Sequence, residues 1–209
     1  MKKSARQIQA EQTKKRILET ALELFRKKGF DNVTVDEIVK KSESSKGAFY
    51  GHFGSKYDIF MEKFKEIDQY YIKVVSVMRE ELTFNEKVLY LVERQMHYLE
   101  FELGKDMMRT VYVSGLMERE GNFFSIHDRG LYAILDEFIV TAIEEGDLPE
   151  DTNRKALIRM LSRCMRGLLY DWLSLGKEYN LEAESRLFFS TFLAGLQCGR
   201  LNATPFEVD

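Results

Sequence analysis

Only two of the 209 residues are proline, and long stretches of the chain repeat their apolar residues with a helical period. Proline breaks a helix interior because it lacks a backbone N–H and its ring clashes with the preceding turn. A chain nearly free of proline can therefore stay helical over most of its length. Residues 13–28, for example, place Ile17, Ala21 and Leu24 on one stripe. The sequence predicts an all-α protein.

Composition narrows the class of protein further. The chain is 44% hydrophobic and 31% charged, as expected of a folded globular protein. It has no run of about 18 apolar residues that would predict a membrane-spanning helix, and the basic N-terminus lacks the apolar core of a secretory signal. Cys164 and Cys198 lack metal-ligand spacing, which favours free thiols in a reducing compartment. We expect a cytoplasmic protein with no metal, no cofactor and no membrane partner.

Charge is distributed unevenly along the chain. Residues 1–56 contain 13 Lys and Arg against 7 Asp and Glu, a net charge of +6, whereas the remainder carries −9. A basic end joined to an acidic body indicates that the first part meets a polyanion and the second does not.

Three short helices are predicted in the basic end. Thr13 is a candidate N-cap for the first and Gly29 ends it. Thr34, followed three residues later by Glu37, has the capping-box pattern for the second. Ser45 is the candidate N-cap of the third, over residues 45–51. A tight turn between the second and third helices makes this a predicted helix-turn-helix unit, whose third helix enters the DNA major groove.

The third helix combines small, polar and aromatic residues in a way that suits this role. Gly47 and Gly51 keep one face low, so that base edges and phosphates can approach, while Phe49 and Phe53 hold the opposite face to the neighbouring helices. Lysine and tyrosine side chains can bind phosphate oxygens, and a small apolar residue such as Ala48 suits a thymine methyl group. The predicted DNA contacts are Thr34, Ser44, Ser45, Lys46, Gly47, Ala48, Tyr50, Gly51, His52 and Lys56.

Residues 15–60 resemble the tetracycline-repressor (TetR) family of transcription regulators. The matching features are Phe25, Gly29 and Phe30, then Thr34 and Ile38, and then the segment Ser45–Lys56, "SKGAFYGHFGSK". One departure lies in the turn, which reads Ser42–Glu43–Ser44–Ser45 where the family usually has Ala–Gly–Val–Ser. Glycine adopts positive φ without steric cost and Glu43 does not. We expect a looser turn, or tuned DNA affinity, but not loss of binding.

The resemblance implies an all-α homodimer with an N-terminal three-helix helix-turn-helix head, residues 10–58, and a C-terminal helical bundle for ligand binding and dimerisation, residues 59–209. It implies a repressor that leaves a pseudo-palindromic double-stranded DNA operator when a small-molecule effector binds.

Apolar stripes on the last two predicted helices, residues 152–175 and 183–200, are candidates for the dimer interface. They can instead pack within one subunit, and periodicity alone does not decide between the two. The predicted interface residues are Leu161, Leu168, Trp172, Phe188, Phe192 and Leu196. Candidates for an effector pocket are the aromatic, Met, His and Arg residues of the central helices, which can equally be core or surface residues: Tyr90, His97, Met108, Tyr112, Phe124, His127, Arg163 and Tyr170.

Other functions fit the residues less well. The three histidines are scattered and form no nucleophile–His–acid set, and no zinc-protease or phosphate-loop motif occurs, so we predict no enzyme activity. A DNA-binding regulator controlled by a protein partner, or by oxidation of Cys164 or Cys198, remains the alternative to a small-molecule switch.

Overall fold

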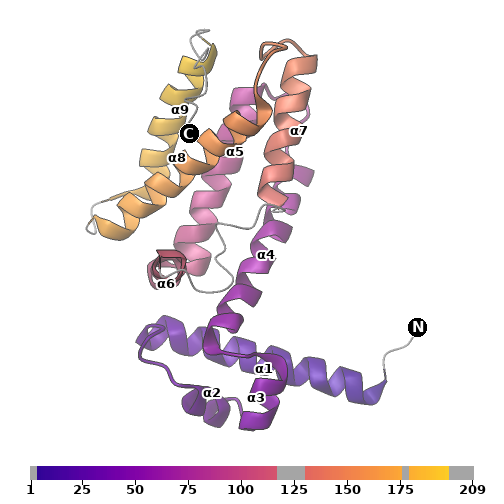
Figure 1. Cartoon of the computed structure of the whole chain (residues 1–209), viewed down its shortest axis with the longest axis vertical. Coiled ribbons are helices and arrows are strands. Elements are labelled where there is room, and N and C mark those ends of the chain that lie inside the picture. The colour runs from indigo at the N-terminus through magenta and orange to yellow at the C-terminus, as the bar shows by residue number, and fades with distance from the viewer. Residues whose placement is uncertain (1–3, 117–129, 176–178, 198–209) are drawn as a thin grey trace, which may run out of the picture. The chain divides into compact units, whose positions relative to one another are not determined.

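The computed structural model describes residues 4–116, 130–175 and 179–197 (Figure 1). Every regular element in these ranges is a helix, which confirms the predicted all-α class. The helices are α1 (Ala5–Lys28), α2 (Val35–Lys41), α3 (Lys46–His52), α4 (Lys56–Ser76), α5 (Phe84–His97), the π-helical η1 (Tyr98–Leu103), α6 (Lys105–Leu116), α7 (Gly130–Glu144), α8 (Arg154–Ser174) and α9 (Leu181–Gln197). None of these helices is both long and apolar enough to cross a bilayer.

Helix α1 begins more than two turns before the predicted start. Ser4, not Thr13, is its N-cap, and Ser4 and Gln7 form a reciprocal capping box. Thr13 lies inside the helix, where its Oγ1 donates to the carbonyl of Gln9 at 3.0 Å. The predicted end is confirmed, since Gly29 follows the last turn with φ +79° and donates its N–H to Phe25 O. Glycine tolerates this positive φ because it has no Cβ.

The first compact unit comprises residues 1–67 and 104–125. Within it, α1 packs against α2, α3 and α6. Three rings form the centre of its core: Phe25 lies 5.0 Å from Phe30 and 5.9 Å from Phe60, and Phe30 lies 5.1 Å from Phe60, measured between centroids. Phe60 is completely buried, as are Ile17 and Ile38. This core fixes how α2 and α3 lie on α1.

The second compact unit comprises residues 68–103 and 126–209. In its described part, α5 packs against α7 and α9, and α8 packs against both α7 and α9 (Figure 1). The division between the units falls inside α4, between Ile67 and Asp68, and α6 belongs to the first unit. The sequence boundary at residues 58 and 59 also lies in α4, about nine residues earlier.

Candidate nucleic-acid interface

Helix α3 has one buried face and one open face. Ser45 is its N-cap, and Ser45 Oγ accepts the N–H of Ala48 at 3.0 Å, as predicted. Phe49 and Phe53 are buried against the rest of the first unit, with their rings 5.9 Å apart. Tyr50 points the other way and is 56% exposed. The four-residue spacing of the two phenylalanines thus anchors α3 and leaves its opposite face uncovered.

That open face is low because of its two glycines. A Cβ added at Gly51 would meet no atom within 4 Å, and one added at Gly47 would meet only Ser45 Oγ at 3.8 Å. Neither glycine has a positive φ, so the backbone conformation would also allow a larger residue at either position. Gly47 and Gly51 are therefore required neither by backbone conformation nor by close packing within the chain. Their smallness is available to a partner that approaches α3 closely.

The predicted contact residues fall at the start of α2, on the turn and α3, and at Lys56, the first residue of α4. Thr34 Oγ1 caps α2 by accepting the N–H of Glu37 at 3.2 Å, although the Glu37 carboxylate does not return to Thr34 and pairs with Lys28 instead. Apart from Lys56, the remaining predicted residues lie together on the turn and on α3. Ser45, Lys46, Gly47, Tyr50 and Gly51 are exposed, and Ser44, Ala48 and His52 are half-buried.

Lys46, the first residue of α3, forms an ion pair that the sequence did not reveal. Its Nζ lies 2.6 Å from Asp36 Oδ1 on α2, and both side chains are more than 60% exposed. The hydrogen bond to Asp36 raises the pKa of Lys46, so the ammonium stays charged. An exposed ion pair contributes little to stability. Lys46 can exchange Asp36 for a phosphate oxygen at small cost.

A second exposed cluster joins α1 to the end of α2. Glu23 accepts from Lys27 Nζ at 2.7 Å and lies 3.0 Å from Lys41 Nζ. The hydrogen bond from Lys27, followed by that from Lys41, lowers the pKa of Glu23 to about 2. The carboxylate is therefore charged at any physiological pH, and both lysines are partly neutralised.

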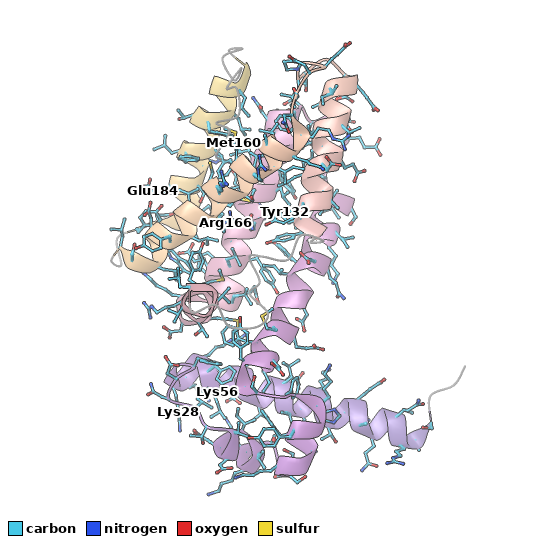
Figure 2. All side chains as sticks on the ribbon, in the orientation of Figure 1. Lys28, Lys56, Tyr132, Met160, Arg166 and Glu184 are labelled. Atoms are coloured by element: carbon cyan, nitrogen blue, oxygen red, sulfur yellow. The ribbon has the colours of Figure 1, made fainter. Side chains whose placement is uncertain are left out.

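Lys56 is engaged inside the first unit. Its side chain is labelled in Figure 2. The ammonium donates to the carbonyl oxygens of Phe30 at 2.7 Å, Val33 at 3.0 Å and Asp31 at 3.5 Å, and it lies 4.3 Å from the centroid of the Phe30 ring. A lysine ammonium has three N–H donors, so these carbonyls use all of them. Lys56 holds the loop between α1 and α2, whereas the sequence predicted a phosphate contact at this position.

The turn between α2 and α3 departs from ordinary backbone geometry at one residue. Glu43 has φ +49°, the only positive φ of a non-glycine residue in the described chain. Around it, Ser42 is buried, Ser42 Oγ and Ser44 Oγ lie 2.9 Å apart, and Ser44 N donates to Val39 O at 3.1 Å. These contacts hold the turn in the left-handed conformation that glycine adopts most readily.

We expect Glu43→Gly to stabilise the first unit by about 0.5–1 kcal/mol, because glycine has no Cβ to strain at this φ and this gain exceeds its entropy cost. DNA affinity should also rise, since a negative charge beside α3 is removed. Glu43→Gln is the matched control, because it removes the charge but keeps the Cβ. It should raise affinity without raising the urea midpoint. Equal midpoints for the wild type and Glu43→Gly would show that the turn carries no strain.

The predicted effector-pocket residues are divided between the two compact units and the part of the chain outside the described residues. Met108 is buried and Tyr112 half-buried in the first unit, whereas the others lie in the second unit or outside the described residues, as Phe124 and His127 do. Arg163 and Tyr170 are exposed on α8. His97 is exposed on α5, with its ring 4.7 Å from that of Phe101.

Tyr90 does line a surface pocket of about 380 Å³ in the second unit. Its walls come from the loop that follows α4, from α5 and from one residue of α9. Lining residues are Val77, Met78, Arg79, Leu82, Glu86, Leu89, Tyr90, Glu93 and Arg186. Arg186 is held by Glu93 at 2.6 Å. Sequence periodicity did not single out this pocket, because it is formed by segments about 100 residues apart.

The predicted interface residues divide into two groups. Leu161, Leu168, Trp172 and Leu196 are at most 9% exposed in a single chain, so the subunit's own helices cover them. Phe188 is 40% exposed and Phe192 is half-buried on α9, with stacked rings 6.1 Å apart. Leu187 beside them is 66% exposed. Among the predicted interface residues, those left uncovered thus lie on α9.

Cys164 is a poor candidate for an oxidation sensor. It is half-buried on α8, and burial raises the pKa of its thiol, which disfavours the reactive thiolate. Cys198 lies outside the described residues.

Comparison with known proteins identifies the family of the N-terminal helix-turn-helix unit. The model for bacterial regulatory proteins of the tetR family matches residues 17–62, which include α2, α3 and the start of α4. The chain belongs to the tetR family. It is therefore a DNA-binding transcriptional regulator with a helix-turn-helix, and not an enzyme.

Relatives of the family extend this match along the chain. The regulator AcrR of Shigella flexneri is 26% identical over 88% of this chain and 89% of its own length. QacR of Staphylococcus aureus is 53% identical over 49 residues, which are 23% of this chain and 26% of QacR. A crystal structure of Thermus thermophilus FadR in complex with lauroyl-CoA has a TM-score of 0.70 at 20% identity, covering 92% of this chain and 98% of that one. At 20% identity, the likeness to FadR shows a shared fold and nothing more.

Proposed function

We propose that this tetR-family regulator is a repressor that binds a pseudo-palindromic operator as a homodimer and leaves it when a small molecule binds. The observation that carries the DNA-binding part is the open face of α3. This face exposes a lysine, a tyrosine and two glycines, and the opposite face of α3 is buried through Phe49 and Phe53. Helix-turn-helix dimers place two such helices in successive major grooves, about one turn of DNA apart.

Each residue of this face has a separate proposed role. Lys46, Tyr50 and His52 bind phosphates and position the head, and Thr34 and Ser44 border the same backbone. Ser45, Gly47, Ala48 and Gly51 lie against base edges, where Ala48 contacts a thymine methyl group. Lys56 is not included among these contacts, because its N–H donors are used by backbone carbonyls.

For the dimer, we propose that the exposed apolar patch of α9, Leu187, Phe188 and Phe192, pairs with its copy, together with the exposed face of α8 that carries Arg163 and Tyr170. Buried apolar surface is the main source of association free energy. Leu161 and Trp172 are buried and pack α8 against helices of its own subunit, so they hold the proposed interface in place without being part of it.

The small-molecule effector is supported by the helical second unit and by its relatives. Thermus thermophilus FadR is in complex with lauroyl-CoA, and another regulator of the same fold, from Saccharomonospora viridis, is in complex with choline. Regulators of this fold thus form complexes with ligands of very different chemistry. For this chain we propose a small-molecule effector bound in the second unit.

The decisive experiment is a footprint on the region upstream of the protein's own gene at controlled salt, with and without a set of hydrophobic and anionic compounds. A two-fold symmetric footprint that one compound releases supports the whole proposal. A footprint that no compound releases supports DNA binding through α3 and favours control by a protein partner. Absence of any footprint, followed by a failed genome-wide site selection, contradicts DNA binding through this face.

Lys46→Ala should weaken operator binding about tenfold per dimer half-site, since a charge-assisted hydrogen bond contributes roughly 1.5–3 kcal/mol. Weakening should be uniform across operator sequences. Each lost phosphate contact reduces the slope of log affinity against log salt by about 0.9, so the dimer should lose about 1.8. Fluorescence anisotropy at five salt concentrations measures both quantities. The control is Lys155→Ala, an exposed lysine of α8, and an unchanged slope for Lys46→Ala would contradict the phosphate contact.

A further inference from the structure

The ion pair between α2 and α3 is more than a surface contact of the fold. Asp36 is the second residue of α2, and its Oδ1 lies 2.6 Å from Nζ of Lys46, the first residue of α3. The two helices pack against each other (Figure 1). The side chains are 68% and 63% exposed. Because an exposed pair of this kind contributes little to folding, stability does not account for it.

Helix α2 has a second acid that meets the local need for negative charge. Carboxylates in the first turn of a helix are favourable because the N-terminus carries a partial positive charge. Asp36 and Glu37 both lie in the first turn of α2. The carboxylate of Glu37 pairs with Lys28 on α1, whereas that of Asp36 reaches across to α3. What distinguishes Asp36 is therefore its contact with Lys46.

Lys46 carries the lysine charge of α3, and the segment around it has no charge to spare. Residues 34–52 contain three lysines and three acidic residues, with no arginine. Lysines of α1 and α2 are also paired with acids, in the pairs Lys14–Glu62, Lys15–Glu19, Lys27–Glu23, Lys28–Glu37 and Lys41–Glu23. Non-specific attraction to DNA comes from unneutralised basic groups. The partner of the Lys46 ammonium thus bears directly on how strongly α3 attracts a phosphate.

A phosphate that approaches the start of α3 meets an ammonium that already holds an anionic oxygen. Charge-assisted N–H···O bonds are about 2.7–2.9 Å long, so the carboxylate of Asp36 occupies a place that a phosphate oxygen would take. The phosphate must displace Asp36 or share the ammonium with it. Displacement loses the attraction within the pair, and sharing brings two anions close together, where they repel. Either way, Lys46 binds phosphate more weakly than an unpaired lysine would.

We propose that Asp36 restrains DNA affinity by competing with phosphate for the Lys46 ammonium. The inference rests on the proposed operator binding and names the residue that limits one of its contacts. Phosphate contacts carry no base recognition, so the restraint acts equally on every DNA sequence. An effector releases DNA only through its different affinities for the two states of the protein, so a restrained contact also makes release easier.

Asp36→Asn, made in the wild type and in the Lys46→Ala variant, tests this proposal. Asparagine keeps the size of the side chain and removes its charge. Glu19→Gln is the matched control, because Glu19 is 64% exposed and lies 3.8 Å from Nζ of Lys15. Glu19 and Lys15 are each two residues from the buried Ile17, so they lie on the opposite side of α1. Fluorescence anisotropy at one salt concentration measures binding to the footprinted operator and to an unrelated duplex of equal length.

We expect Asp36→Asn to tighten binding to both duplexes about threefold per half-site, and so about tenfold for the dimer, which is the size of effect expected of an exposed ion pair. In the Lys46→Ala background, the same substitution should change affinity less than about twofold, because the ammonium for which Asp36 competes is gone. Glu19→Gln should likewise change affinity less than about twofold.

An equal gain from Asp36→Asn in both backgrounds would overturn the inference, because Asp36 would then repel DNA directly. A gain of the same size for Glu19→Gln would overturn it too, since only total charge would then count. Unchanged binding by Asp36→Asn also contradicts the restraint, and weaker binding would mean that the ion pair positions Lys46 for phosphate. If the wild type binds neither duplex, the proposed operator binding fails instead.

Discussion

Phe60→Ala should destabilise the first unit by about 3–5 kcal/mol and abolish operator binding at 37 °C. The Phe60 ring is fully buried and contacts both Phe25 and Phe30, so its removal opens a cavity at the point where α4 meets α1. Truncation of a buried phenylalanine to alanine typically costs this much. Since whole domains are stable by only about 5–15 kcal/mol, a compact unit of this size loses much of its folded population.

Urea unfolding followed by circular dichroism measures the loss, and anisotropy with the operator duplex measures binding. Ile72→Ala is the matched control, because Ile72 lies on the same helix but is 60% exposed. It should shift the midpoint by less than about 0.5 kcal/mol, as surface substitutions usually do. If the two variants unfold at the same urea concentration, the aromatic core does not hold the head together.

Local signals predicted the head well because their physical causes lie within a few residues. Thr34 and Ser45 cap their helices through side-chain oxygens that accept the N–H of the residue three positions later. The sequence predicts this geometry, because it depends only on residue type and spacing. The four-residue spacing of Phe49 and Phe53 likewise fixes which side of α3 is buried. The N-terminal start of α1 was missed because both Ser4 and Thr13 are good N-cap residues, and only the structure shows that Ser4 begins the helix.

Contacts between distant segments could not be predicted in this way. Periodicity showed that Leu161 and Trp172 share a face of α8, but not that helices of the same chain cover that face. The pairing of Lys46 with Asp36 joins two helices whose crossing is set by the core, and no spacing rule indicates it. The same limit applies to Lys56, whose carbonyl partners lie 23 to 26 residues earlier in the chain.

Lys56→Met therefore distinguishes two possible roles of Lys56, a phosphate contact and support of the loop between α1 and α2, which the sequence alone does not separate. Methionine keeps an unbranched side chain of similar length but removes the ammonium, which leaves the carbonyls of Phe30 and Val33 without their donor and ends the contact with the Phe30 ring. Each hydrogen bond to a charged group contributes about 1.5–3 kcal/mol, and the carbonyls regain part of this by binding water. We expect a loss of about 2 kcal/mol in the free energy of unfolding.

The effect of Lys56→Met on DNA binding should differ in kind from that of Lys46→Ala. Loosening the loop between α1 and α2 displaces Thr34 and the start of α2, so operator affinity should fall several-fold. The number of phosphate contacts is unchanged, however, and the salt slope should equal that of the wild type. Faster hydrogen exchange at the amides of residues 31–33 would locate the disturbance in the loop. A slope reduced by about 1.8, with normal loop protection, would mean that Lys56 leaves its carbonyls to bind phosphate when DNA is present.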